Sequence, residues 1–191
     1  VAAARYQNTF IHRAVTGFVI QGGGYTATVP RSHIPTFAAV QNEFNLGNVR
    51  GTVAMAKVGN DPNSATSEWY FNVRDNSTSL NQSNGGGYTV FGRVLGTGMT
   101  VVDPMASLPR FDAGSPFTEL PLRNYTTGNP TEANLVIITS VTPVTLYPTG
   151  SGPSVLALTV QNSAPSVVTA QLTGATLTLT PAGTGSATIT I

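Results

Sequence analysis

The sequence contains no cysteine, little charge and no long apolar run. A chain without cysteine cannot depend on disulfides for stability, although this leaves its redox compartment open. It nowhere contains the roughly 20 consecutive apolar residues of a membrane-spanning helix, so no segment is predicted to cross a bilayer. The formal net charge is +1, which gives no electrostatic argument for binding nucleic acid or an acidic membrane. The two histidines, His12 and His33, have no cysteine or clustered carboxylates beside them in the sequence, so no metal site is expected.

Charged residues make up 9% of the 191 residues, and hydrophobic residues make up 40%. A typical globular chain is about 25% charged, so Thr, Ser, Asn and Gln must form most of the polar surface here. The hydrophobic fraction is sufficient for a packed core. The length suits one domain of about 100–150 residues together with a remainder.

The composition changes near residue 142. From Thr145 to Ile191 there is no charged residue, and alternating apolar residues predict short strands around residues 156–160, 177–179 and 187–191. Turn-forming residues separate these strands, a pattern typical of part of an immunoglobulin-like sandwich. The predicted organisation is therefore one domain at residues 1–141 and a partial β-sandwich at residues 142–191.

Two short apolar runs, at residues 10–15 and 18–21, organise the first domain. They are joined at Thr16-Gly17 and followed by three glycines, which predicts two neighbouring strands. Alternation places Val19 and Gln21 on one side of the second strand and Ile20 on the other. Arg13 from the first strand and Gln21 from the second are therefore expected to converge on one surface.

Further strands are predicted at residues 51–56, 67–73, 88–94 and 135–141, and a helix at residues 99–106. Loops are predicted at residues 25–42, 59–64, 84–87 and 108–132. An interior proline costs a helix about 3 kcal/mol, so Asp103 is expected to cap a short helical turn that Pro104 begins.

The strand at residues 67–73 has two different faces. Trp69, Phe71 and Val73 form an apolar set that suits a core. The other set, Glu68, Tyr70 and Asn72, is left for a cleft.

Several motifs follow one another in order along this domain. F-I-H-R-x-x-x-G-F-V-I-Q-G-G lies at residues 10–23, G-T-V-A-M-A at 51–56, D-P-N-S-A-T-S at 61–67, Y-T-V-F-G-R-V at 88–94 and G-M-x-V-V-D at 98–103. With this ordered set, the chain resembles bacterial-type cyclophilin peptidyl-prolyl cis-trans isomerases over residues 5–141. The resemblance implies a mainly β fold, a closed antiparallel β-barrel capped by helices, with its site in a groove on the outer wall. A larger part of the family's domain precedes the first motif, so we expect the barrel to be incomplete at its N-terminus and both ends of the chain to be truncated.

The resemblance also implies the residues of the site. Arg13 falls on the catalytic arginine of the family. The implied substrate-binding positions are Phe18, Val19, Gln21, Met55, Ala56, Lys57, Glu68, Tyr70, Leu80 and Tyr88. Among them, Met55 to Lys57 match the segment whose backbone pairs with a bound peptide, and Tyr70 and Leu80 match the proline pocket. No cofactor or metal is implied, and the expected partners are proline-containing polypeptides.

These residue types suit rotation about an X–Pro bond. The barrier to amide rotation is about 18–20 kcal/mol, and no covalent bond has to break, so neither a nucleophile nor a metal is required. Once the amide twists, the prolyl nitrogen becomes pyramidal and basic, and a guanidinium donor beside it favours the transition state. In this interpretation Arg13 is the donor, and Phe18, Met55, Tyr70 and Leu80 grip the ring.

Two positions depart from the family's S-Q-F-F pattern: Glu68 replaces a glutamine and Tyr70 a phenylalanine. Glu68 is expected near Arg13, where it would either hold the guanidinium or compete with substrate for it. Three functions stay open: an isomerase, a proline-binding module with weak turnover, and a surface or adhesion protein. The isomerase is favoured, and the low charge and Thr-rich tail indicate an extracytoplasmic protein.

Overall fold

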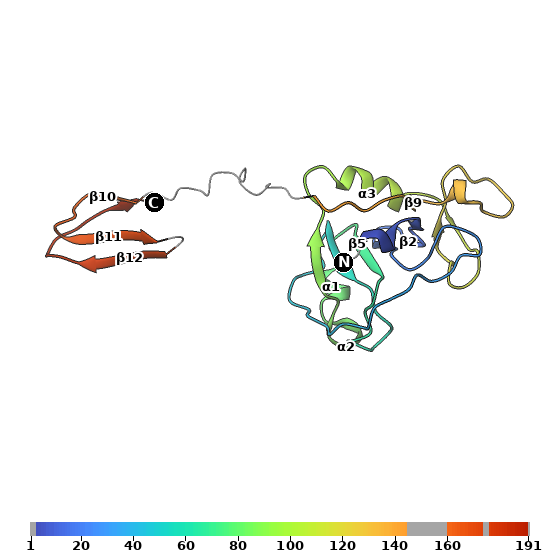
Figure 1. Cartoon of the computed structure of the whole chain (residues 1–191), viewed down its shortest axis with the longest axis horizontal. Coiled ribbons are helices and arrows are strands. Elements are labelled where there is room, and N and C mark those ends of the chain that lie inside the picture. The colour runs from blue at the N-terminus through green and yellow to red at the C-terminus, as the bar shows by residue number, and fades with distance from the viewer. Residues whose placement is uncertain (1–2, 145–159, 174–175, 191) are drawn as a thin grey trace. The chain divides into compact units, whose positions relative to one another are not determined.

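The structure is a computed structural model, and it describes residues 3–144, 160–173 and 176–190. The chain divides into two compact units, residues 1–142 and 143–191, and each unit is described by itself (Figure 1). The sequence places the corresponding boundary one residue earlier, after Val141.

A five-stranded antiparallel sheet lies at the centre of the first unit. Its strands, in spatial order, are β2 (Arg13–Val15), β3 (Val19–Gly22), β5 (Trp69–Asn72), β4 (Thr52–Met55) and β6 (Val90–Arg93). Two smaller antiparallel pairs join β1 (Thr9–Phe10) to β9 (Ile137–Ile138) and β7 (Arg110–Phe111) to β8 (Leu120–Pro121). The predicted mainly β class is confirmed. Closure of the strands into a barrel stays a prediction.

The strand predicted at residues 10–15 is divided in two. Phe10 ends β1, and Arg13 begins β2. Between them, the Ile11 N–H donates to the Val136 carbonyl at 2.9 Å, and the His12 N–H donates to the Gln21 carbonyl at 3.1 Å. The backbone therefore switches its hydrogen-bonding partner from the segment at Val136 to the strand at Gln21 within one apolar run. An alternation of apolar residues does not indicate such a switch. The strand predicted at 135–141 is likewise reduced to the two residues of β9.

The helices of this unit are α1 (Ser77–Leu80), α2 (Ser83–Gly86) and α3 (Met99–Ala106), with 3-10 turns η1 (Ala3–Tyr6) and η2 (Glu132–Asn134). Contrary to the expected short turn, α3 continues through Pro104. Proline removes one backbone hydrogen bond, while Val102 and Ala106 are buried in a core cluster on either side of it. The predicted loop at 84–87 overlaps α2. The predicted loop at 108–132 contains β7 and β8, because Leu120 is buried in an apolar cluster and Phe111 packs against it.

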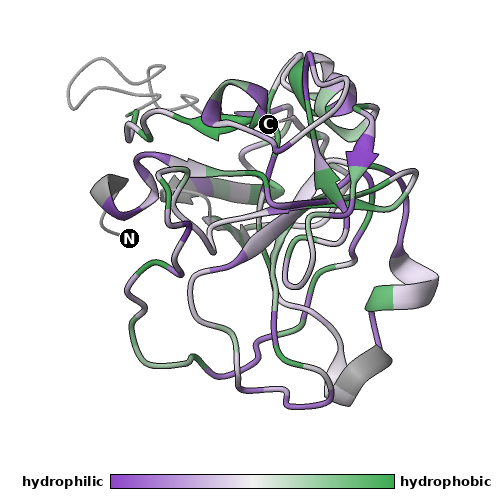
Figure 2. Cartoon of the chain, turned by 90° about the vertical axis from the view of Figure 1, so that its right-hand side faces the viewer, coloured by the Kyte–Doolittle hydropathy of each residue, from purple (hydrophilic) through white to green (hydrophobic). Residues whose placement is uncertain are grey.

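Both faces of the sheet are covered. On one face, Ile20 is buried beside Val102 of α3, and Phe71 packs against them. On the other face, Val19 and Tyr70 are buried beside Leu80 of α1. Figure 2 shows hydrophobic and hydrophilic segments interleaved along the strands of this unit.

The division of β5 into a core face and a cleft face is therefore wrong in part. Trp69 and Phe71 do pack against a core cluster. Tyr70 and Asn72, which were assigned to a cleft, are only 4% and 0% exposed. The segment around Asn48 and helix α1 covers them.

The described part of the second unit contains two antiparallel pairs. Strand β11 (Val168–Thr173) pairs with β12 (Thr176–Pro181), and β10 (Gln161–Asn162) pairs with β13 (Ile189–Thr190). The strand predicted around Leu177 and Leu179 is thus β12. Most of the strand predicted at 156–160, and Ile191, lie outside the described residues, and the immunoglobulin-like sandwich stays a prediction. Across the described ranges of both units, no helix has the length and apolar character that crossing a membrane requires.

Candidate active site

Arg13 and Gln21 face each other across β2 and β3. The register pairs Arg13 with Gln21, Gln21 with Tyr70, and Tyr70 with Ala54. Directly opposed residues in an antiparallel sheet project from the same face. The expected convergence of Arg13 and Gln21 on one surface is therefore confirmed.

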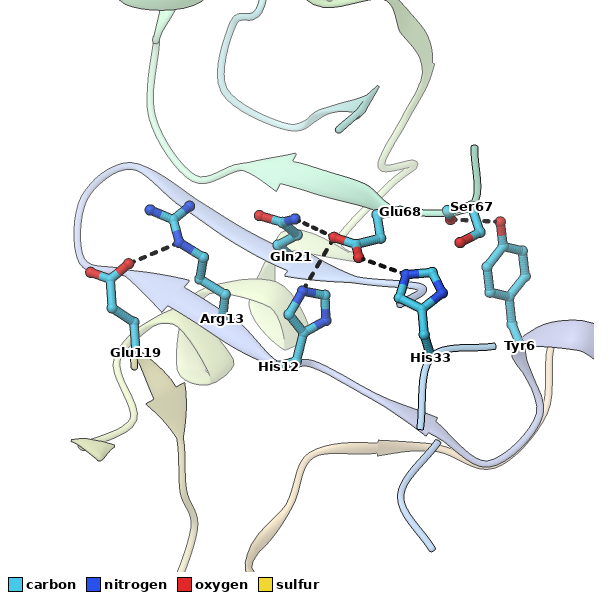
Figure 3. A network of polar contacts seen from close by, with 8 residues as sticks. All are labelled: Tyr6, His12, Arg13, Gln21, His33, Ser67, Glu68 and Glu119. Atoms are coloured by element: carbon cyan, nitrogen blue, oxygen red, sulfur yellow. Dashed lines mark hydrogen bonds and ion pairs between the residues drawn. The ribbon is translucent and has the colours of Figure 1, made fainter. Parts of the chain in front are cut away.

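Glu119 is the ion-pair partner of Arg13. Arg13 Nε donates to Glu119 Oε2 at 2.8 Å, and Arg110 Nη1 lies 3.7 Å from Glu119 Oε1. The two terminal nitrogens of Arg13 point away from Glu119 (Figure 3). A guanidinium has five N–H donors, so this contact orients Arg13 and leaves its terminal donors for another acceptor.

The expectation that Glu68 lies against Arg13 is wrong. Glu68 instead accepts a hydrogen bond from Gln21 Nε2 at 2.6 Å and lies 3.1 Å from His33 Nε2 and 3.4 Å from His12 Nε2. The three partners surround its carboxylate (Figure 3). His12 and His33 therefore do share a carboxylate neighbour, which their positions in the sequence do not reveal.

Electrostatics keeps Glu68 ionised. Burial alone would raise the pKa of the Glu68 carboxyl group. The hydrogen bond and the charge of His12, together with hydrogen bonds from Gln21 and His33, outweigh burial and lower this pKa from 4.5 to about 2. The histidine nitrogens contact different carboxylate oxygens. Within the described residues, no group of three His, Cys, Asp or Glu side chains could hold a metal ion.

Two glycines after β3 allow the carboxylate to sit there. A Cβ atom on Gly24 would lie 2.6 Å from Glu68 Oε1. Gly23 has a φ of +81°, and a Cβ there would lie 2.6 Å from the Ser67 carbonyl oxygen. Because these glycines have no Cβ atom, the Ser67 backbone and the Glu68 side chain can approach the triple-glycine motif closely.

A single apolar cluster contains most of the predicted substrate-binding residues. Val19, Tyr70 and Leu80 are buried in it. Packed against them are three more of the predicted positions, Phe18, Ala56 and Tyr88. The Tyr70 and Tyr88 rings meet edge to face, with centroids 5.9 Å apart. The structure therefore brings together six residues that span 71 positions of the sequence, from 18 to 88.

A buried asparagine network supports this cluster, and sequence reasoning missed it. Tyr70 OH donates to Asn48 Oδ1 at 2.9 Å, and burial raises the pKa of the Tyr70 hydroxyl. Asn76 Nδ2 donates to the Phe18 carbonyl at 2.8 Å and to Asn72 Oδ1 at 2.7 Å. The available signal was the position of Asn72, two residues from Tyr70 on the same face of β5.

Met55 and Lys57 lie partly apart from this cluster. Met55 pairs with Trp69, which by alternation places its side chain on the face opposite Tyr70. Met55 and Lys57 line a cavity of about 340 Å³ with Thr89 and Phe91. Lys57 Nζ nevertheless lies 4.9 Å from the centroid of the Tyr88 ring, and burial lowers the pKa of Lys57.

The expected peptide-pairing segment already uses two of its backbone donors. The Met55 N–H donates to the Thr89 carbonyl, and the Ala56 N–H donates to the Glu68 carbonyl, both at 2.9 Å. A bound peptide would therefore have to pair with other backbone groups of residues 55–57.

Comparison with known proteins gives a consistent result. Residues 1–127 match the family model described as cyclophilin type peptidyl-prolyl cis-trans isomerase. The chain is 42% identical over 106 residues to a peptidyl-prolyl cis-trans isomerase of Acinetobacter baylyi, covering 54% of each chain. It is 44% identical over 108 residues to one of Streptomyces antibioticus, covering 54% of this chain and 63% of that protein. Against peptidyl-prolyl cis-trans isomerase B of Escherichia coli, identity is 43% over 103 residues, covering 51% and 60%.

A solved structure also resembles the chain. It is a Cryptosporidium parvum cyclophilin type peptidyl-prolyl cis-trans isomerase in the presence of the dipeptide Ala-Pro, at 21% identity and a TM-score of 0.46, covering 72% of this chain and 78% of that chain. The alignments with the three bacterial relatives span between about half and two thirds of the length of each relative.

Proposed function

Since the chain belongs to the cyclophilin-type peptidyl-prolyl cis-trans isomerase family, we propose that it accelerates rotation about X–Pro peptide bonds in polypeptides. The observation that carries this proposal is the orientation and hydrogen bonding of the Arg13 side chain. Its Nε is held by Glu119, its terminal nitrogens point away from that partner, and Gln21 faces it across the β2–β3 pair.

The arrangement suits a reaction in which no covalent bond breaks. Uncatalysed X–Pro isomerisation takes on the order of tens to hundreds of seconds, because the amide must lose its conjugation. A terminal N–H of Arg13 beside the prolyl nitrogen would stabilise the lone pair that appears as the amide twists. That hydrogen bond is stronger in the twisted state than in the planar one, so it lowers the barrier.

Two properties of the site support this role for Arg13. The guanidinium is charged at all relevant pH values, and its planar set of donors is already oriented by Glu119. The apolar residues Phe18 and Val19 follow β2 after the Thr16-Gly17 turn and belong to the same cluster as Leu80. A proline ring held against this cluster would leave its preceding carbonyl free to rotate.

A second candidate function rests on a separate observation. Tyr70 and Leu80, which the resemblance assigns to the proline pocket, are only 4% and 7% exposed. A pocket this covered would hold the proline ring less firmly in the twisted state than an open pocket would, and this corresponds to a proline-binding module with weak turnover. Binding without acceleration would distinguish it from an isomerase.

A protease-coupled assay with a proline peptide tests the proposal. We expect the wild-type chain to accelerate isomerisation and Arg13→Ala to lower kcat/KM by about 100-fold or more, the usual cost of removing a donor to a transition state. Arg93→Ala, at an exposed arginine at the end of β6, is the matched control and should retain wild-type activity. Equal rates for the wild type and Arg13→Ala would overturn the proposal. Peptide binding by an inactive wild type would support the second function instead.

A further inference from the structure

We propose that His33 and Glu68 are positioning residues that fix the amide of Gln21 with its oxygen toward the substrate, so that the site selects peptides offering a backbone N–H beside the X–Pro bond. This inference rests on the proposed function. It states that Gln21 accepts a hydrogen bond from the substrate rather than donating one. It also gives a role to His33 and Glu68, which lie outside the apolar cluster.

The first step is the charge of His33. Its Nδ1 lies 3.0 Å from the Ile34 carbonyl oxygen, and its Nε2 lies 3.1 Å from Glu68 Oε1. A carbonyl oxygen and an ionised carboxylate are both acceptors only. Both ring nitrogens therefore donate, and a ring with two N–H groups is an imidazolium.

His12 differs from His33 in this respect. Its Nε2 lies 3.4 Å from Glu68 Oε2, but its buried Nδ1 has no hydrogen-bond partner among the described residues. A bare ring nitrogen tolerates this position better than an N–H would, because an unpaired buried donor costs about 1–3 kcal/mol. The remaining titratable group beside the two rings is Tyr25, whose ring centroid lies 5.0 Å from each.

The second step is the orientation of Gln21. Its closest polar contact is 2.6 Å to Glu68 Oε2, and a carboxylate can only accept, so the Gln21 atom there is the NH₂ group. Gln21 Oε1 then points away from Glu68, toward the side on which Arg13 lies (Figure 3). Within the described part of the chain, the side-chain hydrogen bond of Gln21 is the one that its Nε2 donates to Glu68.

The third step concerns the substrate. The terminal N–H groups of Arg13 and the Oε1 of Gln21 form a donor and an acceptor on neighbouring strands. A peptide that offers its own acceptor to Arg13 and a backbone N–H to Gln21 satisfies both. An analogue with a methyl group on that nitrogen lacks the donor and leaves Gln21 Oε1 unpaired, which lowers affinity.

Histidine nitrogen NMR tests the proposal without any peptide. In the whole chain, labelled on histidine, we expect both ring nitrogens of His33 to carry protons, because each of them faces an acceptor. His33→Asn assigns the two signals. A singly protonated His33 would overturn the proposal, whether or not the chain is an isomerase.

Peptide binding tests its consequence for selectivity. Affinities are measured by isothermal titration calorimetry for a proline peptide and for its analogues N-methylated on either side of the X–Pro unit. We expect the wild type to prefer the parent peptide by about tenfold over one of the analogues, as loss of one hydrogen bond implies. Glu68→Gln, which can accept from or donate to Gln21, should reduce that preference to about twofold. Equal preference in both proteins would overturn the proposal, and failure of every peptide to bind would overturn it together with the proposed function.

Discussion

Protonation of Glu68 is expected to destabilise the first unit at acid pH. The carboxylate accepts from Gln21 and lies within 3.4 Å of both histidines, and its pKa falls from 4.5 to about 2 on folding. One pKa unit corresponds to about 1.4 kcal/mol, so ionised Glu68 contributes about 2–3 kcal/mol to the free energy of unfolding, allowing for the 22% of the side chain that stays exposed.

The sign follows from the direction of the change. A carboxyl group whose pKa is lower in the folded state stabilises the fold fully above its unfolded pKa and loses that contribution as pH falls toward its folded pKa. The contribution should therefore be complete above about pH 5 and nearly gone near pH 2. Glu68→Gln has no such titration, so its unfolding free energy should fall less over the same interval, by about 2–3 kcal/mol.

Urea unfolding followed by tryptophan fluorescence measures this difference. Trp69 is the only tryptophan of the chain and lies in β5 beside Glu68, with its ring 5.2 Å from that of Phe71. It therefore reports on the first unit. Glu132→Gln makes the same chemical change at an exposed position and should follow the wild type. The same pH dependence in the wild type and both variants would refute the role assigned to Glu68.

Two further substitutions test contacts of the site. Glu119→Gln removes the charge that holds Arg13 Nε. Because the pair is partly exposed and such pairs contribute up to about 1 kcal/mol, kcat should fall up to about fivefold with KM nearly unchanged. A fall of 100-fold would show that Glu119 does more than orient Arg13. Tyr70→Phe removes the donor to Asn48 and should lower the free energy of unfolding by about 1 kcal/mol, measured by urea unfolding; a stability equal to that of the wild type would contradict the buried network.

The local part of the site could be predicted from the sequence. Arg13 and Gln21 lie eight positions apart on either side of one turn, so strand alternation was sufficient to place them together. The assignment of Trp69 and Phe71 to a core also followed from alternation. It failed for Tyr70 because both faces of β5 are covered, and alternation alone cannot show what packs on the second face.

The remaining contacts depend on distant segments. Glu119 is separated from Arg13 by 106 positions, in a segment whose proline and glycine content predicts a loop. His33 reaches Glu68 across 35 positions, also from a predicted loop. In a sequence, each of these charged or polar side chains has many possible partners of complementary charge. Only the fold determines which of them lies within hydrogen-bond distance. The same holds for α3, where tertiary burial of Val102 and Ala106 outweighs the local preference of Pro104.

Exchange NMR on a proline peptide tests the central claim most directly, because it records cis-trans interconversion without a coupling protease. With a catalytic amount of the wild-type chain, cross-peaks should connect the cis and trans signals of the peptide within a fraction of a second, whereas the uncatalysed reaction takes on the order of tens of seconds or longer. The cross-peaks should disappear when Arg13→Ala replaces the wild type. Their absence with folded wild-type protein, or their persistence with Arg13→Ala, would contradict the account.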